Sequence, residues 1–262
     1  MSQIPALTGG RRLSHDAVSE KQFVSRSPGT YVELFSDFIQ DVGETANLPF
    51  VYSETGGSGA QTGDFIDAPD GVFRLAHTAA DEVQANLLSL GGTNAISPTK
   101  EVIFEARVKV NLNTDSTFST DSVYEVIVGM ATAGSAVSVS AGAFDGFADN
   151  VGFRLGGGAQ ATNSIFLESD DGTTDNDDKD SGIDFTSGTY HTYKIDMTDI
   201  SNVKFYVDGV SANNGNTFDM SAIAATDYLE PFILFARTNS GATPDRAHSL
   251  DIDYVKCTWK RS

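Results

Sequence analysis

Strict alternation of apolar and polar residues is the feature that most constrains what this chain can fold into. It is clearest in EVIFEARVKVNL, residues 101–112, where every second residue from Val102 to Leu112 is apolar and most of the others are charged. A period of two sends successive side chains to opposite faces of a β-strand. The segment therefore predicts an antiparallel strand with one face on a core and the other toward solvent.

The same period recurs along most of the chain, and helical periodicity is nearly absent. In GVFRLAHT it places Phe73, Leu75 and His77 on one face, while YVELFSDFIQ (31–40) and ADEVQANLLSL (80–90) fit either a strand or a short helix. Two polar stretches, the Gly-rich 53–64 and the Asp-rich 169–182, are predicted as loops. We predict an all-β chain of two packed antiparallel sheets, a jelly-roll-like sandwich. Further strands are expected in VYEVIVGMA, NVGFRLGG, SIFLES, TYHTYKIDM, NVKFYVDG, YLEPFILFART and SLDIDYVKCTW.

The 262 residues suit one sandwich domain preceded by an extended arm. Residues 1–30 show no sustained period and are interrupted by Pro and Gly, so we predict an arm over 1–30 and the domain over 31–262. The arm has four basic residues against two acidic ones, which favours docking onto an acidic neighbour; a disordered terminus is the alternative. The residues expected to dock are Ile4, Leu7, Arg11, Arg12, Leu13, Phe23 and Arg26.

The net charge of −19 narrows the partners that the chain can have. Such a field repels nucleic acid and anionic membrane, so we expect neither as a partner. No apolar run approaches the roughly 18 residues that a membrane span needs, and the first residues lack the apolar stretch of a secretory signal. A single cysteine, Cys257, fits synthesis in a reducing compartment.

Two segments resemble the concanavalin A-like lectin and glucanase fold. GTYHTYKIDMTDISNVKFYVDG, residues 188–209, is similar to a hairpin of the family 16 glycoside hydrolases, and LDIDYVKCTW, residues 250–259, is similar to their closing strand. The resemblance covers roughly residues 100–260. It implies a concanavalin A-like jelly-roll sandwich, as in legume-type lectins and laminin-G-like modules, and is specific for fold rather than activity.

The order of the other segments is also similar to concanavalin A-like structural proteins of tailed-phage particles. It runs from YVELFSDFI through DAPDGVFRLAHTAADEVQANLLSL and NVGFRLGGGAQATNSIFLESDDGT to the hairpin. This resemblance implies a non-enzymatic virion protein that is made in the host cytoplasm and decorates or cements a phage capsid. Its partners would be the major capsid protein or other virion subunits, with further copies of itself as a homo-oligomer on the particle.

The catalytic signature of the glucanases, Glu-x-Asp-x-x-Glu, is missing, and we predict no catalytic residues. Glu101 and Glu105 on one strand face would be about 13 Å apart, too far for either glycosidase geometry. Asp251 and Asp253 would be about 7 Å apart, within the inverting range, but the resemblance implies a structural role for that aspartate. A pairing of Glu105 with Glu125 across strands stays open.

The Asp-rich segment raises the question of calcium, which takes oxygen ligands. Its spacing departs from an EF-hand because Lys179 occupies a ligand position and no glutamate closes the loop. We predict no cofactor, with a calcium site of another geometry and a solvated loop as the two alternatives for this segment. The candidate ligands are Asp170, Asp171, Asp175, Asp177, Asp178 and Asp180.

Carbohydrate binding is the alternative function, with surface glycans as the ligand and a diverged glycoside hydrolase as a third possibility. A lectin site needs an aromatic platform with polar neighbours, and Trp259 is the single tryptophan. Tyrosines at strand positions also fit ordinary β-sheet packing. The tyrosines available for such a platform are Tyr190, Tyr193, Tyr206, Tyr228 and Tyr254.

Overall fold

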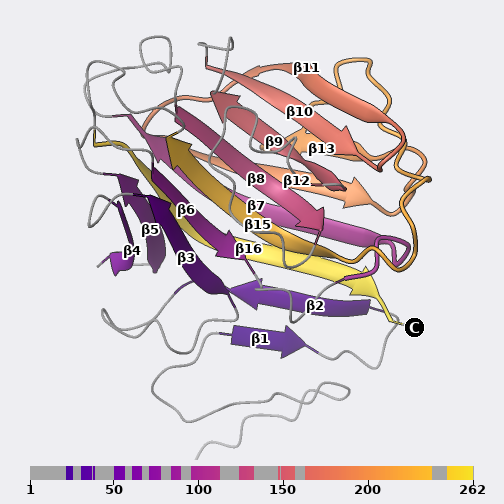
Figure 1. Cartoon of the computed structure of the whole chain (residues 1–262), viewed down its shortest axis with the longest axis horizontal. Coiled ribbons are helices and arrows are strands. Elements are labelled where there is room, and N and C mark those ends of the chain that lie inside the picture. Colours follow the sequence, from indigo (N-terminus) through magenta and orange to yellow (C-terminus); the bar gives the residue numbers. More distant parts are fainter. Residues whose placement is uncertain are drawn as a thin grey trace, which may run out of the picture.

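The chain folds into a sandwich of two antiparallel β-sheets (Figure 1). The computed structural model describes residues 22–25, 31–36, 38, 50–56, 61–66, 71–77, 84–89, 96–112, 124–132, 147, 149–156, 163–237 and 247–261. Within these ranges the regular structure is β-strand, which confirms the predicted fold class. No helix in the described part of the chain is long and apolar enough to cross a membrane.

One sheet, which we call the β8 sheet, has the strand order β11-β10-β9-β8-β15-β6-β3. Its neighbouring strands all run antiparallel. The strands are β3 (Val51–Gly56), β6 (Gln84–Ser89), β8 (Tyr124–Thr132), β9 (Asn150–Gly156), β10 (Ser164–Asp170), β11 (Asp175–Asp184) and β15 (Leu229–Arg237).

The other sheet, the β16 sheet, has the order β1-β2-β16-β7-β12-β13-β14. β7 lies along one side of β16, while β5 pairs with residues 249–252 and β2 with residues 255–260 on the other side; β4 pairs with β5. The strands are β1 (Gln22–Ser25), β2 (Tyr31–Ser36), β4 (Gln61–Ile66), β5 (Val72–His77), β7 (Val102–Asn111), β12 (Tyr190–Met197), β13 (Lys204–Val207), β14 (Val210–Ser211) and β16 (Ser249–Lys260).

The core lies between the sheets and follows the predicted alternation. Along β7 buried and partly exposed residues alternate without a break, and Phe104 is fully buried. The face predicted for β5 is confirmed, because Phe73, Leu75 and His77 are all buried. From the opposite sheet β8 contributes Val126 to the same core. Burying one such large side chain stabilises the fold by about 1.5–3 kcal/mol.

The hairpin that resembles the glucanase hairpin is held by a histidine. His191 Nδ1 lies 2.7 Å from Asp208 Oδ2, and His191 Nε2 accepts a hydrogen bond of 3.1 Å from the Thr186 amide. Asp208 also accepts the Thr192 amide at 2.8 Å. Asp208 and Gly209 have φ of 50° and 78°, as a tight turn between strands requires. The motif therefore serves the geometry of β12 and β13, which explains why it indicates a fold and not a reaction.

Both segments predicted as loops contain strands. β3 and β4 occupy much of 53–64, and β11 occupies 175–184 of the Asp-rich segment. The loop prediction is wrong at β4, where Gly63 lies within a strand and does not mark a turn. A Cβ at Gly63 would lie 2.3 Å from the Tyr52 ring, so glycine there permits close packing of that ring on a strand.

We expect Cys257 to resist alkylation in the folded protein. Its side chain is fully buried in the core, and burial raises the pKa of its thiol, so the reactive thiolate is scarce. Iodoacetamide at pH 8 should label the native chain at least ~100-fold more slowly than the chain in urea, as followed by mass spectrometry. Equal rates in the two conditions would contradict the burial of β16 in the core.

Candidate functional site

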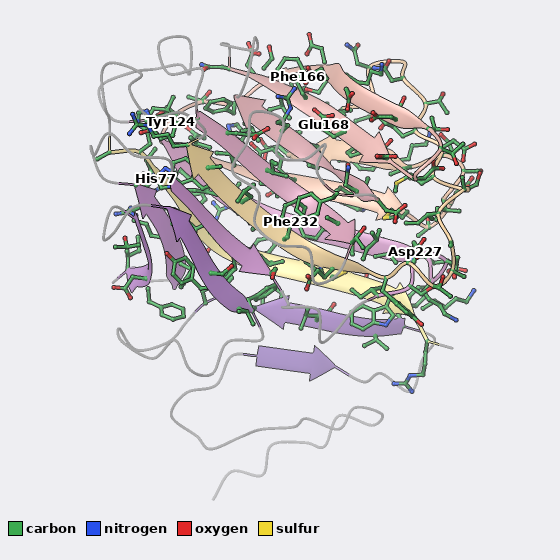
Figure 2. The ribbon with its side chains drawn as sticks, viewed as in Figure 1. His77, Tyr124, Phe166, Glu168, Asp227 and Phe232 are labelled. Atoms are coloured by element: carbon green, nitrogen blue, oxygen red, sulfur yellow. The ribbon has the colours of Figure 1, made fainter. Side chains whose placement is uncertain are left out.

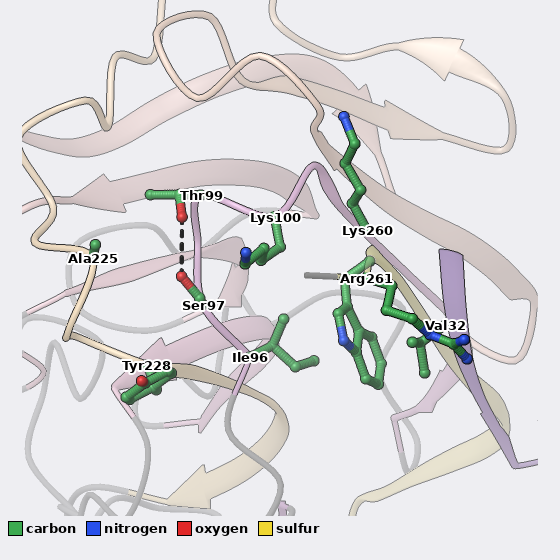
Figure 3. Close-up of a pocket in the computed structure, with 10 residues that line it drawn as sticks. Val32, Ile96, Ser97, Thr99, Lys100, Ala225, Tyr228, Lys260 and Arg261 are labelled. Atoms are coloured by element: carbon green, nitrogen blue, oxygen red, sulfur yellow. Dashed lines mark hydrogen bonds between the residues drawn. The ribbon is translucent and has the colours of Figure 1, made fainter. Parts of the chain in front are cut away.

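A pocket of about 520 Å³ lies at the end of the sandwich where β15 begins and β16 finishes (Figure 3). Its walls come from four stretches that are far apart in the sequence: β2, residues 96–100, the residues before β15, and the end of β16. Figure 3 shows Tyr228 and Val32 on opposite sides of Ile96. The lining residues are Val32, Ile96, Ser97, Thr99, Lys100, Ala225, Tyr228, Trp259, Lys260 and Arg261.

Backbone hydrogen bonds fix these stretches relative to one another. Ile96 and Leu229 exchange two bonds, of 2.7 and 2.9 Å, which attach residues 96–100 to the start of β15. The Lys260 amide donates to the Lys100 carbonyl at 2.6 Å, and Val32 of β2 is the register partner of Trp259. The pocket is therefore built from paired backbone and is preformed in the folded chain.

Two aromatic side chains, Tyr228 and Trp259, line the pocket. Tyr228 is 48% exposed, one of the few large apolar side chains in the described residues to be so open. Trp259 is partly buried, and its buried part packs against the main core. Ser97 and Thr99 place two hydroxyl groups 3.1 Å apart on the same lining. Aromatic faces beside a few polar groups are what small-molecule sites usually present.

Three cations, Lys100, Lys260 and Arg261, line the pocket, and no carboxylate does. Glu101, just outside it, contacts Lys260 Nζ and accepts the Tyr31 hydroxyl at 2.8 Å. The hydrogen bond to Glu101 raises the pKa of the Lys260 ammonium, and the bond from Lys260 lowers the pKa of the Glu101 carboxyl, so both stay charged. Glu101 has φ of 50°, a costly conformation for this residue type.

The structure separates the carboxylates that sequence reasoning left as a possible pair. Glu105 points to the outer side of the β16 sheet, where its register partners are Lys194 and Lys256 and the Tyr254 hydroxyl donates to it at 2.8 Å. Glu125 belongs to the β8 sheet, so the whole core lies between the two. The pairing of Glu105 with Glu125 is therefore wrong. Glu101 lies one residue before β7 and contacts Lys260, while Glu105 has Lys256 as a register partner, so the two carboxylates face different cations.

The outer face of the β8 sheet holds a buried charge cluster. Arg154 Nε lies 2.8 Å from Glu168 Oε1 and Arg154 Nη1 3.8 Å from Glu125 Oε1, and the same guanidinium pairs with Asp178. Arg154, Glu125 and Glu168 are each less than 7% exposed. Glu125 and Glu168 therefore share one guanidinium and are closed to solvent.

An apolar cluster closes the neighbouring part of that face (Figure 2). Phe232, Ile127 and Leu234 lie on the side of the sheet away from the main core and are still at most 3% exposed. The Phe147 ring packs on Phe232 with 5.2 Å between centroids. Along β8 the outward positions after Glu125 are apolar or glycine, so no second carboxylate stands beside it on this strand.

Asp251 and Asp253 are occupied by cations on the outer face of the β16 sheet. Arg74 grips Asp251 with two hydrogen bonds, of 2.6 and 2.9 Å, and Lys109 adds a contact of 2.9 Å. Burial alone would raise the pKa of Asp251, but the bonds from Arg74 and Lys109 outweigh burial and lower it. Arg107 holds Asp253 at 2.5 Å. Both aspartates are thus structural, in line with the resemblance.

The candidate calcium ligands do not converge. Within the described ranges, no three His, Cys, Asp or Glu side chains form a group that could hold a metal ion. Asp171 instead accepts the amides of Thr174 and Ala222, at 2.7 and 3.0 Å, and so ties the turn after β10 to residues before β15. Asp170 and Asp180 each accept the amide two residues ahead. Asp175 and Asp177 are exposed on β11, and Asp178 pairs with Arg154.

The predicted docking arm falls almost entirely outside the described residues. Ile4, Leu7, Arg11, Arg12, Leu13 and Arg26 lie there, and their role stays a prediction. Phe23 belongs to β1, whose backbone pairs with β2 in register with Phe35.

Comparison with known proteins identifies a fold class and no family. No protein-family model and no curated protein matches the chain. A laminarinase from Flavobacterium sp. UMI-01 superimposes with a TM-score of 0.56 at 15% identity, covering 85% of this chain and 97% of the other. The carbohydrate recognition domain of Emp47p gives 0.51 at 11%, covering 82% and 89%.

A third structure, a glutamate-to-serine variant of LamA of Zobellia galactanivorans in complex with laminaritriose and laminaritetraose, gives a TM-score of 0.51 at 12% identity, covering 86% and 97%. These likenesses establish a concanavalin A-like sandwich, the fold of lectin domains and glucanases. At such identities they show the fold alone. They lend no support to the resemblance with phage structural proteins, so the virion role stays a prediction.

Proposed function

We propose that this chain is a carbohydrate-binding protein without hydrolytic activity, and that it holds its saccharide in the pocket beside Trp259 and Tyr228. The observation that carries the proposal is the meeting of the single tryptophan and an exposed tyrosine in one preformed pocket that also presents hydroxyl groups. Among the structures compared, one is a carbohydrate recognition domain and another binds laminari-oligosaccharides, which agrees with this function at the level of fold.

The pocket suits a saccharide in size and chemistry. A volume of about 520 Å³ lies within the roughly 300–1,000 Å³ of small-molecule sites. The apolar face of a sugar ring can pack on an indole or phenol ring, while its hydroxyls exchange hydrogen bonds with Ser97 and Thr99. The pocket does not suit glycoside hydrolysis. That reaction uses a pair of carboxyl groups that flank the scissile bond, and no carboxylate lines this pocket.

Removing either aromatic ring is expected to weaken saccharide binding about 10-fold, the equivalent of one good ring contact. The full chain would first be applied to a glycan array, and the best ligand titrated while the fluorescence of Trp259 is followed. Because Trp259 is the single tryptophan, its emission reports on this pocket alone. The test variants are Tyr228→Ala, followed by fluorescence, and Trp259→Ala, followed by calorimetry.

Tyr206→Ala is the matched control, since Tyr206 is a partly exposed tyrosine on β13 and supplies nothing to the pocket. It should bind like the wild type. Absence of any array ligand, or binding that survives both pocket variants, would contradict the proposal. Release of reducing sugar from the bound ligand would contradict its non-hydrolytic part.

A further inference from the structure

We infer that the saccharide bound in this pocket carries an acid group, either the carboxylate of a uronate or a sulfate ester. The inference rests on the proposed function and specifies the class of ligand. It follows from the charge of the lining, which is opposite to that of the rest of the molecule.

The chain has 36 acidic and 17 basic residues, whereas the lining has basic residues and no acidic one. Lys100, Lys260 and Arg261 lie around the pocket with no carboxylate among the other lining residues. A neutral ligand would bring these cations no counter-charge. An anionic ligand would gain charge-assisted hydrogen bonds from them, which are roughly twice as strong as neutral ones.

The cations differ in how far they are already neutralised. Lys260 is paired with Glu101, and Glu101 is held in turn by the Tyr31 hydroxyl. For Lys100 and Arg261 the described part of the chain offers no carboxylate within ion-pair distance. Two positive charges therefore remain for the ligand. Lys260 is held by Glu101, and Figure 3 shows its side chain pointing away from Ile96.

The placement of the aromatic rings makes a saccharide acid a better fit than a bare anion. Trp259 is the neighbour of Lys260 and Arg261 in sequence, and Tyr228 completes the lining with Lys100. A sugar ring packed on Trp259 or Tyr228 would lie in the same pocket as Lys100 and Arg261, which can pair with its acid group. The planar guanidinium of Arg261 matches the geometry of a carboxylate or a sulfate in particular.

The test uses pairs of ligands that differ in the acid group alone. One pair is tetragalacturonate and its fully methyl-esterified form, and the other is a carrageenan-derived tetrasaccharide and its desulfated form. Each is titrated into the full chain with Trp259 fluorescence as the signal. We expect the acidic member of at least one pair to bind at least about 10-fold more tightly than its neutral counterpart, with an affinity that falls as NaCl rises from 50 to 500 mM. The pair that responds tells a uronate from a sulfate.

The double variant Lys100→Gln/Arg261→Gln is expected to lose about 10- to 100-fold in affinity for the acidic ligand and less than about 2-fold for a neutral one. The charge-matched control is Lys179→Gln/Lys204→Gln on β11 and β13, strands that supply no lining residue. It lowers the net charge by the same amount and should leave binding unchanged. Equal losses in the two double variants would show a general field effect and overturn the inference.

Failure of the inference can be told from failure of the proposed function. Array ligands that are mainly neutral, and that lose binding in Tyr228→Ala, would keep the function and overturn the acid group. Binding of tetraglutamate as tight as that of the acidic saccharide would make the site one for acidic peptides and overturn the inference too. If no saccharide binds, acidic or neutral, the proposed function itself fails.

Discussion

Replacing Asp251 by asparagine is expected to lower the free energy of unfolding by about 3 kcal/mol. Asp251 is fully buried and is held by Arg74 and Lys109. Asparagine fills the same space but removes the negative charge, and it presents an amide NH₂ where a carboxylate oxygen accepted. The two cations then face each other across a group that no longer neutralises them.

The size of the expected destabilisation follows from how deeply Asp251 and its two cationic partners are buried. Removing one partner of a buried ion pair typically costs about 3–5 kcal/mol. The Arg74 and Lys109 side chains are 37% and 22% exposed, so water recovers part of the loss, and the lower end of that range applies. β5 and β7 flank β16 at this point, so the charge network joins three strands through their side chains as well as their backbone.

Asp253→Asn is the matched control, because it makes the same substitution two residues further along β16. Arg107, the partner of Asp253, is 42% exposed, and exposed ion pairs contribute at most about 1 kcal/mol. Urea unfolding at pH 7, followed by circular dichroism, would give both values. Equal destabilisation by the two substitutions would show that burial does not govern the strength of these pairs.

The interior of the sandwich was predictable from sequence because burial and strand geometry act together on residues close in the chain. The alternation of β7 and the face that carries Phe73 and His77 both appear as predicted. β11 shows where this signal ends. Its residues are mostly polar and exposed, and it is a strand because its backbone pairs with β10. No periodicity of side chains records such pairing.

The candidate site was predictable in part. Trp259 and Tyr228 were among the aromatic residues considered from sequence, and the structure brings these two together. Lys100 was missed, because its place beside Trp259 depends on the bridge between Ile96 and Leu229 and on the bond from the Lys260 amide. Such contacts join residues more than 130 positions apart. The one local signal was the run WKR at 259–261, which puts two cations beside the tryptophan of an acidic chain.

The proposed pocket lies at the end of the sandwich and not on the outer face of the β8 sheet. The outer face of the β8 sheet is closed by the apolar cluster around Phe232 and by the pairs of Arg154. The end of the sandwich is left open beside Tyr228. The sealed sheet face and the open pocket therefore involve different residues, so variants in the proposed binding pocket should leave the buried pairs of that face intact.

We expect His77 to make the stability of the fold sensitive to acid. Figure 2 shows His77 at the end of the sandwich away from Asp227, the residue just before Tyr228 of the pocket. The His77 ring stacks on Phe235 with 4.1 Å between centroids, and Tyr124 lies 5.8 Å away. Burial, with the charges of His248 and Arg237 nearby, lowers the pKa of His77 from 6.5 to about 3. The folded state therefore keeps the imidazole neutral over a range in which the unfolded chain takes up a proton.

The sign of the effect follows from that difference. Because the folded pKa lies below the unfolded one, the stability that neutral His77 contributes is fully present above about pH 6.5 and is lost as pH falls toward 3. The loss approaches about 1.4 kcal/mol for each pH unit within that window. Between pH 7 and pH 5 the wild type should lose about 2 kcal/mol more than a variant that lacks this titration.

His77→Phe is that variant, since phenylalanine keeps an aromatic ring on Phe235 and cannot be protonated. The free energy of unfolding would be measured by urea titration at pH 7, 6 and 5 for both proteins, so that groups common to them cancel in the difference. The stability of the variant should fall less steeply with acid. Parallel curves would mean that His77 takes up a proton in the fold as readily as in the unfolded chain, which a buried ring stacked on Phe235 and close to Tyr124 does not permit without solvent.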